Sequence, residues 1–172
     1  MAISILRHII SFLLLAGLQV YVLNNLDING YLNPQVFILF LLLLPVNSDI
    51  WLCLLAGFVS GALVDGVAGT YGIHAFTGTA LGYFRYFYIK YSLDKEEIER
   101  GMTPNLRNMP TLWHLMYILI SCLFYHWIAF FMEAFTFSGL SIMSLKAVTS
   151  GLTATALILL LGFLFSRKTT NV

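Results

Sequence analysis

The stretch that decides the fold runs from Ile50 to Asp65 and reads IWLCLLAGFVSGALVD. No charged residue occurs in it before Asp65. A soluble domain carries about 25% charged residues. This chain of 172 residues carries only 10%, against 59% hydrophobic residues. So few charges cannot cover a surface that faces water, so we expect lipid to surround most of the protein.

Similar apolar runs recur along the chain. A membrane-crossing helix needs roughly 20 apolar residues, because the hydrocarbon core is about 30 Å thick. The runs are continuous and do not alternate as barrel strands do, which favours helices. We therefore predict an all-α membrane protein, a single domain over residues 1–172 with a bundle of about six transmembrane helices. The expected helices are 9–26, 32–46, 50–64, 73–91, 112–135 and 145–165, with a polar cytoplasmic loop at 92–110. Run 32–46 is short, so its full crossing stays open.

The orientation follows from lysine and arginine, which concentrate on the cytoplasmic side of membrane proteins. With six helices, seven of these residues fall on one side and only Lys146 on the other. We therefore predict that both termini are cytoplasmic. The first run lacks a signal-peptide cleavage pattern and is expected to remain as a helix.

A glycine pattern lies inside the central run. Gly57, Gly61, Asp65 and Gly69 recur at every fourth position, which places them on one face of a helix. Small residues on such a face let a second helix approach closely in lipid. The pattern predicts either packing between the protein's own helices or a surface for a partner's helix. Asp65 is expected to accept backbone N–H bonds near the glycines or to contact a partner.

Other polar residues are isolated. His126 and Glu133 are seven residues apart and share a helix face. This suits a proton relay or ion site, a hydrogen-bonded pair between helices, or a carboxylate of Glu133 at the outer membrane interface. Arg85 is expected to extend its charge towards the membrane surface. Asp94 and Glu97 predict a capping box that starts a short helix in the polar loop.

Several classes of function are disfavoured. Ser60 and His126 suggest an intramembrane serine protease, but Phe58 stands where such enzymes have glycine. No metalloprotease or phosphate-binding motif occurs. A net charge of +1 gives no basic excess that would bind nucleic acid. Cys53 and Cys122 lack neighbours at metal-ligand spacing. We expect no enzyme activity, no cofactor and no metal.

A longer pattern surrounds the glycine face. It consists of Gly57, Gly61 and Asp65, then Gly72-Ile73-His74-Ala75, then Gly82-Tyr83-Phe84-Arg85. This order, together with Pro34 at the start of the second run, resembles the rod shape-determining protein MreD family. Chain length and number of apolar runs are also similar. The family motif falls here on Gly57, Gly61, Asp65, Gly72 and His74.

The resemblance implies a non-enzymatic scaffold of the cell-wall elongation machinery in the bacterial cytoplasmic (inner) membrane. It implies an MreC-like single-span partner and, through it, RodA, its penicillin-binding transpeptidase and MreB filaments. The family is similar in fold to the substrate-binding subunits of energy-coupling-factor transporters. The alternative is therefore a subunit of a vitamin-type importer, with Asp65, His74, His126 and Glu133 near one outward-facing pocket. Of the Ala-x-x-x-Ala docking pattern of such subunits, only Ala16 is present.

Overall fold

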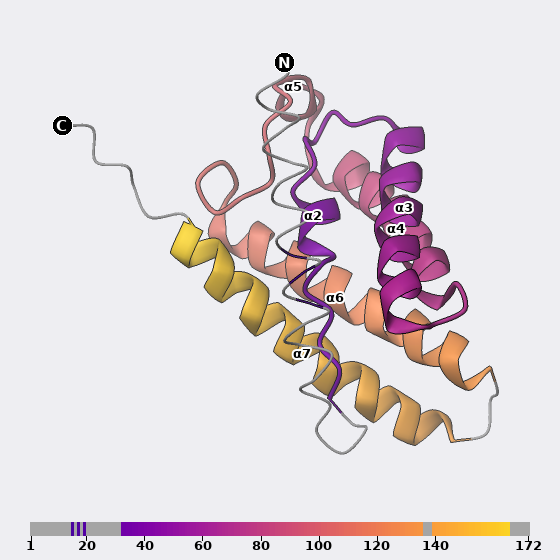
Figure 1. The fold of residues 1–172 in the computed structure, drawn as a ribbon. Helices are drawn as coiled ribbons and strands as arrows, with labels where there is room; N and C mark the ends of the chain where they lie inside the picture. The colour runs from indigo at the N-terminus through magenta and orange to yellow at the C-terminus, as the bar shows by residue number, and fades with distance from the viewer. Residues whose placement is uncertain (1–14, 16, 18, 20–31, 136–138, 166–172) are drawn as a thin grey trace.

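The computed structural model describes residues 15, 17, 19, 32–135 and 139–165 (Figure 1). These residues form helices and no strand, which confirms the all-α prediction for this part of the chain. The helices are α2 (Leu39–Leu42), α3 (Ile50–Ala68), α4 (Ile73–Ser92), α5 (Lys95–Glu99), α6 (Thr111–Ala134) and α7 (Leu140–Phe165).

Three of these helices, α3, α6 and α7, are long and apolar enough to cross a membrane. The fourth long helix, α4, has 20 residues, which corresponds to about 30 Å. Its composition is less apolar because it contains tyrosines, threonines and the charged Arg85. The length and composition of α3, α6 and α7 thus indicate a membrane protein.

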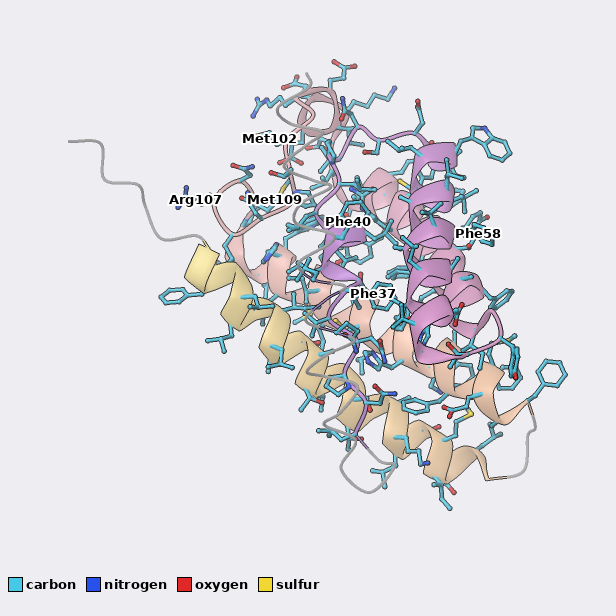
Figure 2. The ribbon with its side chains drawn as sticks, viewed as in Figure 1. Phe37, Phe40, Phe58, Met102, Arg107 and Met109 are labelled. Atoms are coloured by element: carbon cyan, nitrogen blue, oxygen red, sulfur yellow. The ribbon has the colours of Figure 1, made fainter. Side chains whose placement is uncertain are left out.

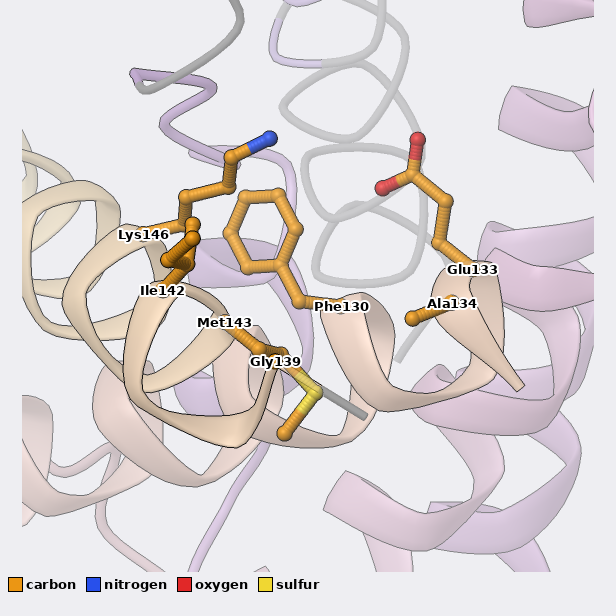
Figure 3. Close-up of a pocket in the computed structure, with 7 residues that line it drawn as sticks. All are labelled: Phe130, Glu133, Ala134, Gly139, Ile142, Met143 and Lys146. Atoms are coloured by element: carbon orange, nitrogen blue, oxygen red, sulfur yellow. The ribbon is translucent and has the colours of Figure 1, made fainter. Parts of the chain in front are cut away.

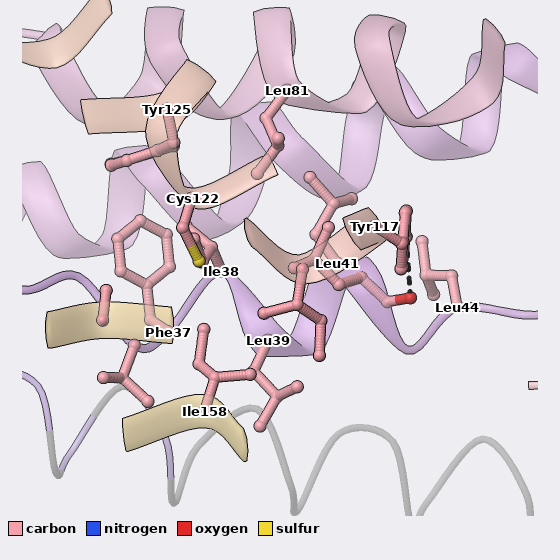
Figure 4. Close-up of a cluster of buried hydrophobic side chains, with 14 of the residues drawn as sticks. Phe37, Ile38, Leu39, Leu41, Leu44, Leu81, Tyr117, Cys122, Tyr125 and Ile158 are labelled. Carbon is pink, nitrogen blue, oxygen red and sulfur yellow. Dashed lines mark hydrogen bonds between the residues drawn. The ribbon is translucent and has the colours of Figure 1, made fainter. Parts of the chain in front are cut away.

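Two helical hairpins enclose the middle of the molecule. Figure 1 shows α3 beside α4 and α6 beside α7, while α4 also packs on α6. Residues 32–49, here called the central segment, run between the two hairpins and contain α2. The hydrophobic core centres on this segment: Phe37, Ile38 and Leu41 are buried against side chains of α4, α6 and α7 (Figure 4).

The central segment corrects one prediction. The expected helix at 32–46 is wrong, because only Leu39–Leu42 are helical. Proline lacks the N–H that a helix interior requires, and Pro34 and Pro45 lie on either side of α2. Non-helical backbone can lie at membrane depth when protein buries it, and residues 34–39 are all buried.

The central segment nevertheless follows the length of α6. The N–H of Gln35 bonds to His126, the carbonyl of Leu42 bonds to Tyr117, and the N–H of Val46 reaches Met102 in the loop before α6. These contacts move steadily from the later part of α6 past its beginning. The segment therefore runs antiparallel to α6, with non-helical backbone at 33–36 followed by α2 and the turns on either side of it.

The other helix bounds differ less from expectation. Helix α3 continues to Ala68 and so includes Asp65, which was expected in a loop; Gly69 ends it with a φ of 70°. Helices α4 and α6 match their predicted ranges to within about a residue. Helix α7 begins at Leu140, five residues before its predicted start, directly after Gly139 with a φ of 83°. Polar residues in its first turns interrupt the apolar run, so the sequence pattern places the start of this helix too late.

The polar loop contains the predicted short helix. Asp94 and Glu97 form a reciprocal capping box at the start of α5, which confirms that prediction. The expected helix 9–26 lies mostly outside the described residues, although Leu15, Gly17 and Gln19 are helical. Both termini also lie outside the described residues.

Candidate functional site

The glycines of α3 contact α4 directly. A Cβ atom added to Gly57 would lie 2.1 Å from the carbonyl oxygen of Gly78. A Cβ on Gly61 would lie 2.1 Å from the carbonyl oxygen of His74. Real Cβ atoms do not approach backbone so closely, so only glycine fits at either place. Of the two interpretations of this face, packing between the protein's own helices is the one that the structure shows.

Asp65 caps the helix that follows its own. Its Oδ1 accepts the N–H of His74 at 3.1 Å and its Oδ2 accepts the N–H of Ala75 at 2.8 Å. The hydroxyl of Thr70 also donates to Oδ1. The N-cap residue of α4, Gly72, has no side chain to do this. A carboxylate at this place satisfies free N–H groups and meets the positive end of the helix dipole.

The remaining two glycines of the motif shape the turn. Gly69 has a φ of 70° and Gly72 a φ of 83°, and a Cβ on either would meet nothing within 4 Å. Residues with side chains rarely adopt this conformation. These glycines therefore serve the connection between α3 and α4, which brings Asp65 to the start of α4.

His74 joins α4 to α6 and to the central segment. Its Nδ1 lies 2.7 Å from the hydroxyl of Tyr125, and the two rings stack with centroids 6.3 Å apart. Phe37 packs edge-on against both rings, at 6.1 and 5.8 Å. Sequence analysis missed Tyr125 and Phe37, because nothing in their own neighbourhood distinguishes them from other apolar aromatic residues.

His126 holds the backbone of the central segment. Its Nε2 accepts the N–H of Gln35 at 3.1 Å, and its Nδ1 donates to the carbonyl oxygen of Cys122 at 2.7 Å. One nitrogen donates and the other accepts, which describes a neutral ring in one tautomer. His126 and Glu133 do not form a pair, because His126 is buried and Glu133 lies exposed at the end of α6. Of the interpretations of Glu133, a carboxylate near the end of the helix is the one that agrees with this position.

Three further side chains bind the same backbone. The amide of Gln19 donates to the carbonyl of Pro34 at 3.2 Å and accepts the N–H of Val36 at 2.7 Å. The hydroxyl of Ser150 accepts the N–H of Asn33 at 3.0 Å. Figure 4 shows Tyr117, whose hydroxyl donates to the carbonyl of Leu42 at 3.0 Å. Side chains thus replace the hydrogen bonds that a helix would have made.

Arg85 is buried, so the prediction that it extends to the membrane surface is wrong. Only 1% of its surface is exposed. Its guanidinium donates to the carbonyls of Leu44 and Pro45, the latter at 3.1 Å, and to Sγ of Cys53 at 3.2 Å. The carbonyl of Leu44, just after α2 ends, offers an acceptor that a continuous helix would use itself, and the carbonyl of Pro45 also accepts from Ser48. Arg85 therefore fixes the far end of the central segment.

Two hollows lie near the end of the bundle where α4 begins. The smaller, of about 60 Å³, is lined by Asn33, Gln35, Thr70, Ile73, His74, His126, Ala129, Phe130 and Glu133. It brings His74, His126 and Glu133 to one cavity, while Asp65 lies behind it. The larger, of about 400 Å³, is lined by Phe130, Glu133, Ala134, Gly139, Ile142, Met143 and Lys146 (Figure 3).

The chemistry of these residues does not suit a metal. In the ranges that the structure describes, no three histidine, cysteine, aspartate or glutamate side chains lie close enough to hold one.

The two cysteines, Cys53 and Cys122, are both free and buried. Ser60 donates its hydroxyl to the carbonyl of Gly57 at 3.1 Å, within its own helix.

Comparisons of the chain with protein-family models, with curated proteins and with solved structures found no match.

Proposed function

We propose that this chain is a non-enzymatic scaffold of the bacterial cell-wall elongation machinery that crosses the cytoplasmic membrane several times. The sequence pattern from Gly57 to Arg85, which resembles the MreD family, supplies the cellular context of this proposal. The structure supports it through the way in which the buried polar groups are used.

The observation that carries the proposal is the fixation of the central segment. His126 and Arg85, buried side chains that could otherwise do chemistry, hold its backbone, and Asp65 holds the start of α4. A catalytic group must be able to reach a substrate, and these groups face backbone. A rigid interior of this kind suits a protein that acts through its outer surface.

The topology belongs to the same proposal. Helix α4 lies antiparallel to α3 with backbone contact at Gly57 and Gly61, so it crosses wherever α3 crosses. The central segment crosses beside α6 without being a helix. With the first apolar run this gives six crossings. The end that carries α5 and the polar loop is then cytoplasmic, together with both termini.

The partner in this proposal is an MreC-like single-span protein, with RodA, its transpeptidase and MreB filaments beyond it. Gly57 and Gly61 lie inside the protein, so this partner must use an outward surface. Figure 2 shows Phe58 pointing away from the bundle while Phe37 points into it. Outward residues such as Phe58 are therefore the ones to change when partner binding is tested.

The experiment is purification of the full chain through a C-terminal tag after mild solubilisation of membranes. Recovery of an MreC-like protein with the wall-synthesis enzymes is the expected result. Recovery of an ATPase pair with a coupling membrane subunit would overturn the scaffold in favour of a transporter. Gly66→Ala, which adds a methyl group where nothing lies within 4 Å, controls for nonspecific effects of substitution in α3.

The alternative is an importer subunit, and the smaller hollow brings together His74, His126 and Glu133, three of the four residues expected at its pocket. The larger hollow, of about 400 Å³, contains only Glu133 of these. Glu133 and Lys146 lie on either side of Phe130 within it (Figure 3). A ligand that binds the folded protein raises its unfolding temperature. A vitamin that did so in a thermal-shift screen would support this alternative, and no response would oppose it.

A further inference from the structure

The smaller cavity carries an inference that is independent of the scaffold proposal. It lies between the start of the central segment, the beginning of α4 and the last turns of α6. Six of its nine lining residues are polar, which is unusual for an interior that is otherwise apolar. Buried polar cavities normally hold water or a ligand, whereas empty ones are apolar.

Several donors at this cavity are already paired. The backbone N–H groups of Asn33, Gln35 and His74 already have acceptors in Ser150, His126 and Asp65. The side-chain Nε2 of Gln35 donates to Asn33 at 2.8 Å.

The fully buried side-chain atom that lacks a hydrogen-bond partner at this cavity is Oε1 of Gln35, a residue only 3% exposed. Among the described residues, the carboxylate of Glu133 also has no hydrogen-bond or ion-pair partner. Lys146, which lines the neighbouring hollow, has a contact of its own. An occupant of the cavity therefore has to bring N–H or O–H donors.

The local charge favours a cation. Glu133 lies in the last turn of α6, where the unpaired carbonyls and the helix dipole are negative. The positive end of α4, which lies on the other side of the cavity, is already neutralised by Asp65. Phe130 adds an aromatic ring to the wall, and such rings attract ammonium groups.

The size of the cavity limits the occupant. About 60 Å³ is room for only a few water molecules. A primary ammonium group with one carbon fits this space, and a quaternary ammonium group, which also lacks N–H donors, does not. We propose that this cavity binds a primary ammonium group, with Glu133 as its counter-charge and the amide oxygen of Gln35 as a buried acceptor.

Two sources can supply this chemistry: a free small amine, or the ethanolamine headgroup of a membrane lipid. Both carry the same R–NH₃⁺ group, and the cavity lies at the end of α6, where the proposed topology puts lipid headgroups. The experiment therefore tests the ammonium group first and its source second.

The first arm measures thermal unfolding of the purified full chain in detergent with methylammonium chloride. Sodium chloride and tetramethylammonium chloride at equal ionic strength serve as references. We expect only methylammonium to raise the midpoint, with half of the effect on the order of 10 mM, as suits a ligand of two heavy atoms. Equal shifts with all three salts would overturn the proposal, as would no shift, which would mean that the cavity holds water only.

Variants localise the effect. Glu133→Gln keeps the shape of the side chain but removes its charge, and should weaken the methylammonium response at least tenfold. Gln35→Met removes the buried acceptor and should weaken it as well. Glu96→Gln removes an exposed charge on α5, outside the cavity, and should leave the response unchanged. A full response in Glu133→Gln would overturn the proposed site.

The second arm places the protein in lipid discs made with or without phosphatidylethanolamine in a phosphatidylcholine background. If the headgroup is the occupant, the ethanolamine lipid stabilises the native chain more than Glu133→Gln and reduces its response to methylammonium. If a free amine is the occupant, the methylammonium response is the same in both lipids. An ethanolamine effect of equal size in both proteins overturns the lipid as the source.

Discussion

The carboxylate of Asp65, on α3, accepts the backbone N–H of Ala75, on α4, at 2.8 Å. The last turn of one helix thus caps the first turn of the next. Asp65, Gly72 and His74 of the family motif and Gly69 of the glycine pattern all belong to this one connection.

Removal of this cap should destabilise the protein. Asp65→Ala leaves the N–H groups of His74 and Ala75 buried without acceptors, at a cost of about 1–3 kcal/mol. Asp65→Asn keeps one acceptor oxygen and should cost less. Thermal unfolding in detergent measures both. Asp49→Asn is a suitable control, because Asp49 precedes α3 without making a side-chain cap bond; an equal loss there would contradict the cap.

The glycine contact gives a second prediction with a matched control on the same helix. Gly61→Ala puts a Cβ 2.1 Å from the carbonyl oxygen of His74, so α3 and α4 must separate. We expect a loss of about 1–3 kcal/mol or more in unfolding free energy. Gly66→Ala meets nothing within 4 Å and should stabilise α3 by up to about 1 kcal/mol. Equal stability of the two variants would exclude the close contact.

His126 gives a prediction that can be measured at one amide. His126→Phe removes the acceptor of the Gln35 N–H, whereas His126→Gln can present an oxygen near the same place. Hydrogen exchange of the Gln35 amide should therefore accelerate strongly in the phenylalanine variant and less in the glutamine variant. If the ring only filled space, phenylalanine would protect this amide better than glutamine.

Arg85 should be essential for the end of the central segment. Arg85→Met leaves the buried carbonyl of Leu44 without its donor, at a cost of about 1–3 kcal/mol. The carbonyl of Pro45, in contrast, keeps the N–H and the hydroxyl of Ser48. Alkylation of Cys53, which is fully buried beside Arg85, should become faster as the segment loosens. Arg100→Met, at an exposed position after α5, should change neither stability nor alkylation.

The sequence predicts the long helices because their signal is local. Apolar runs locate α3, α4 and α6 well, and Asp94 with Glu97 is enough to predict the capping box of α5. The glycine face of α3 is also visible. Its use inside the protein is not, because that depends on Gly78 and other α4 positions that lie opposite it only after folding.

The central segment could not be predicted because its partners are distant. Its composition is as apolar as that of a membrane helix, and only Pro34 and Pro45 indicate otherwise. The groups that hold its backbone lie far along the chain: Tyr117 is 75 residues from Leu42, and His126 is 91 residues from Gln35. The sequence also does not reveal that His126 accepts a backbone hydrogen bond or that Arg85 is buried, because both depend on the fold of this segment.

The central segment has a consequence for the biogenesis of the protein. Its backbone partners Arg85, Tyr117, His126 and Ser150 are all translated after it, and Ser150 follows Asn33 by 117 residues. At synthesis rates of about 5–20 residues per second this delay is on the order of 10 s. In the proposed topology the N–H groups of Asn33 and Gln35 lack their acceptors during this delay, and lipid supplies none. Residues 32–49 then reach their final place only once α7 has been made.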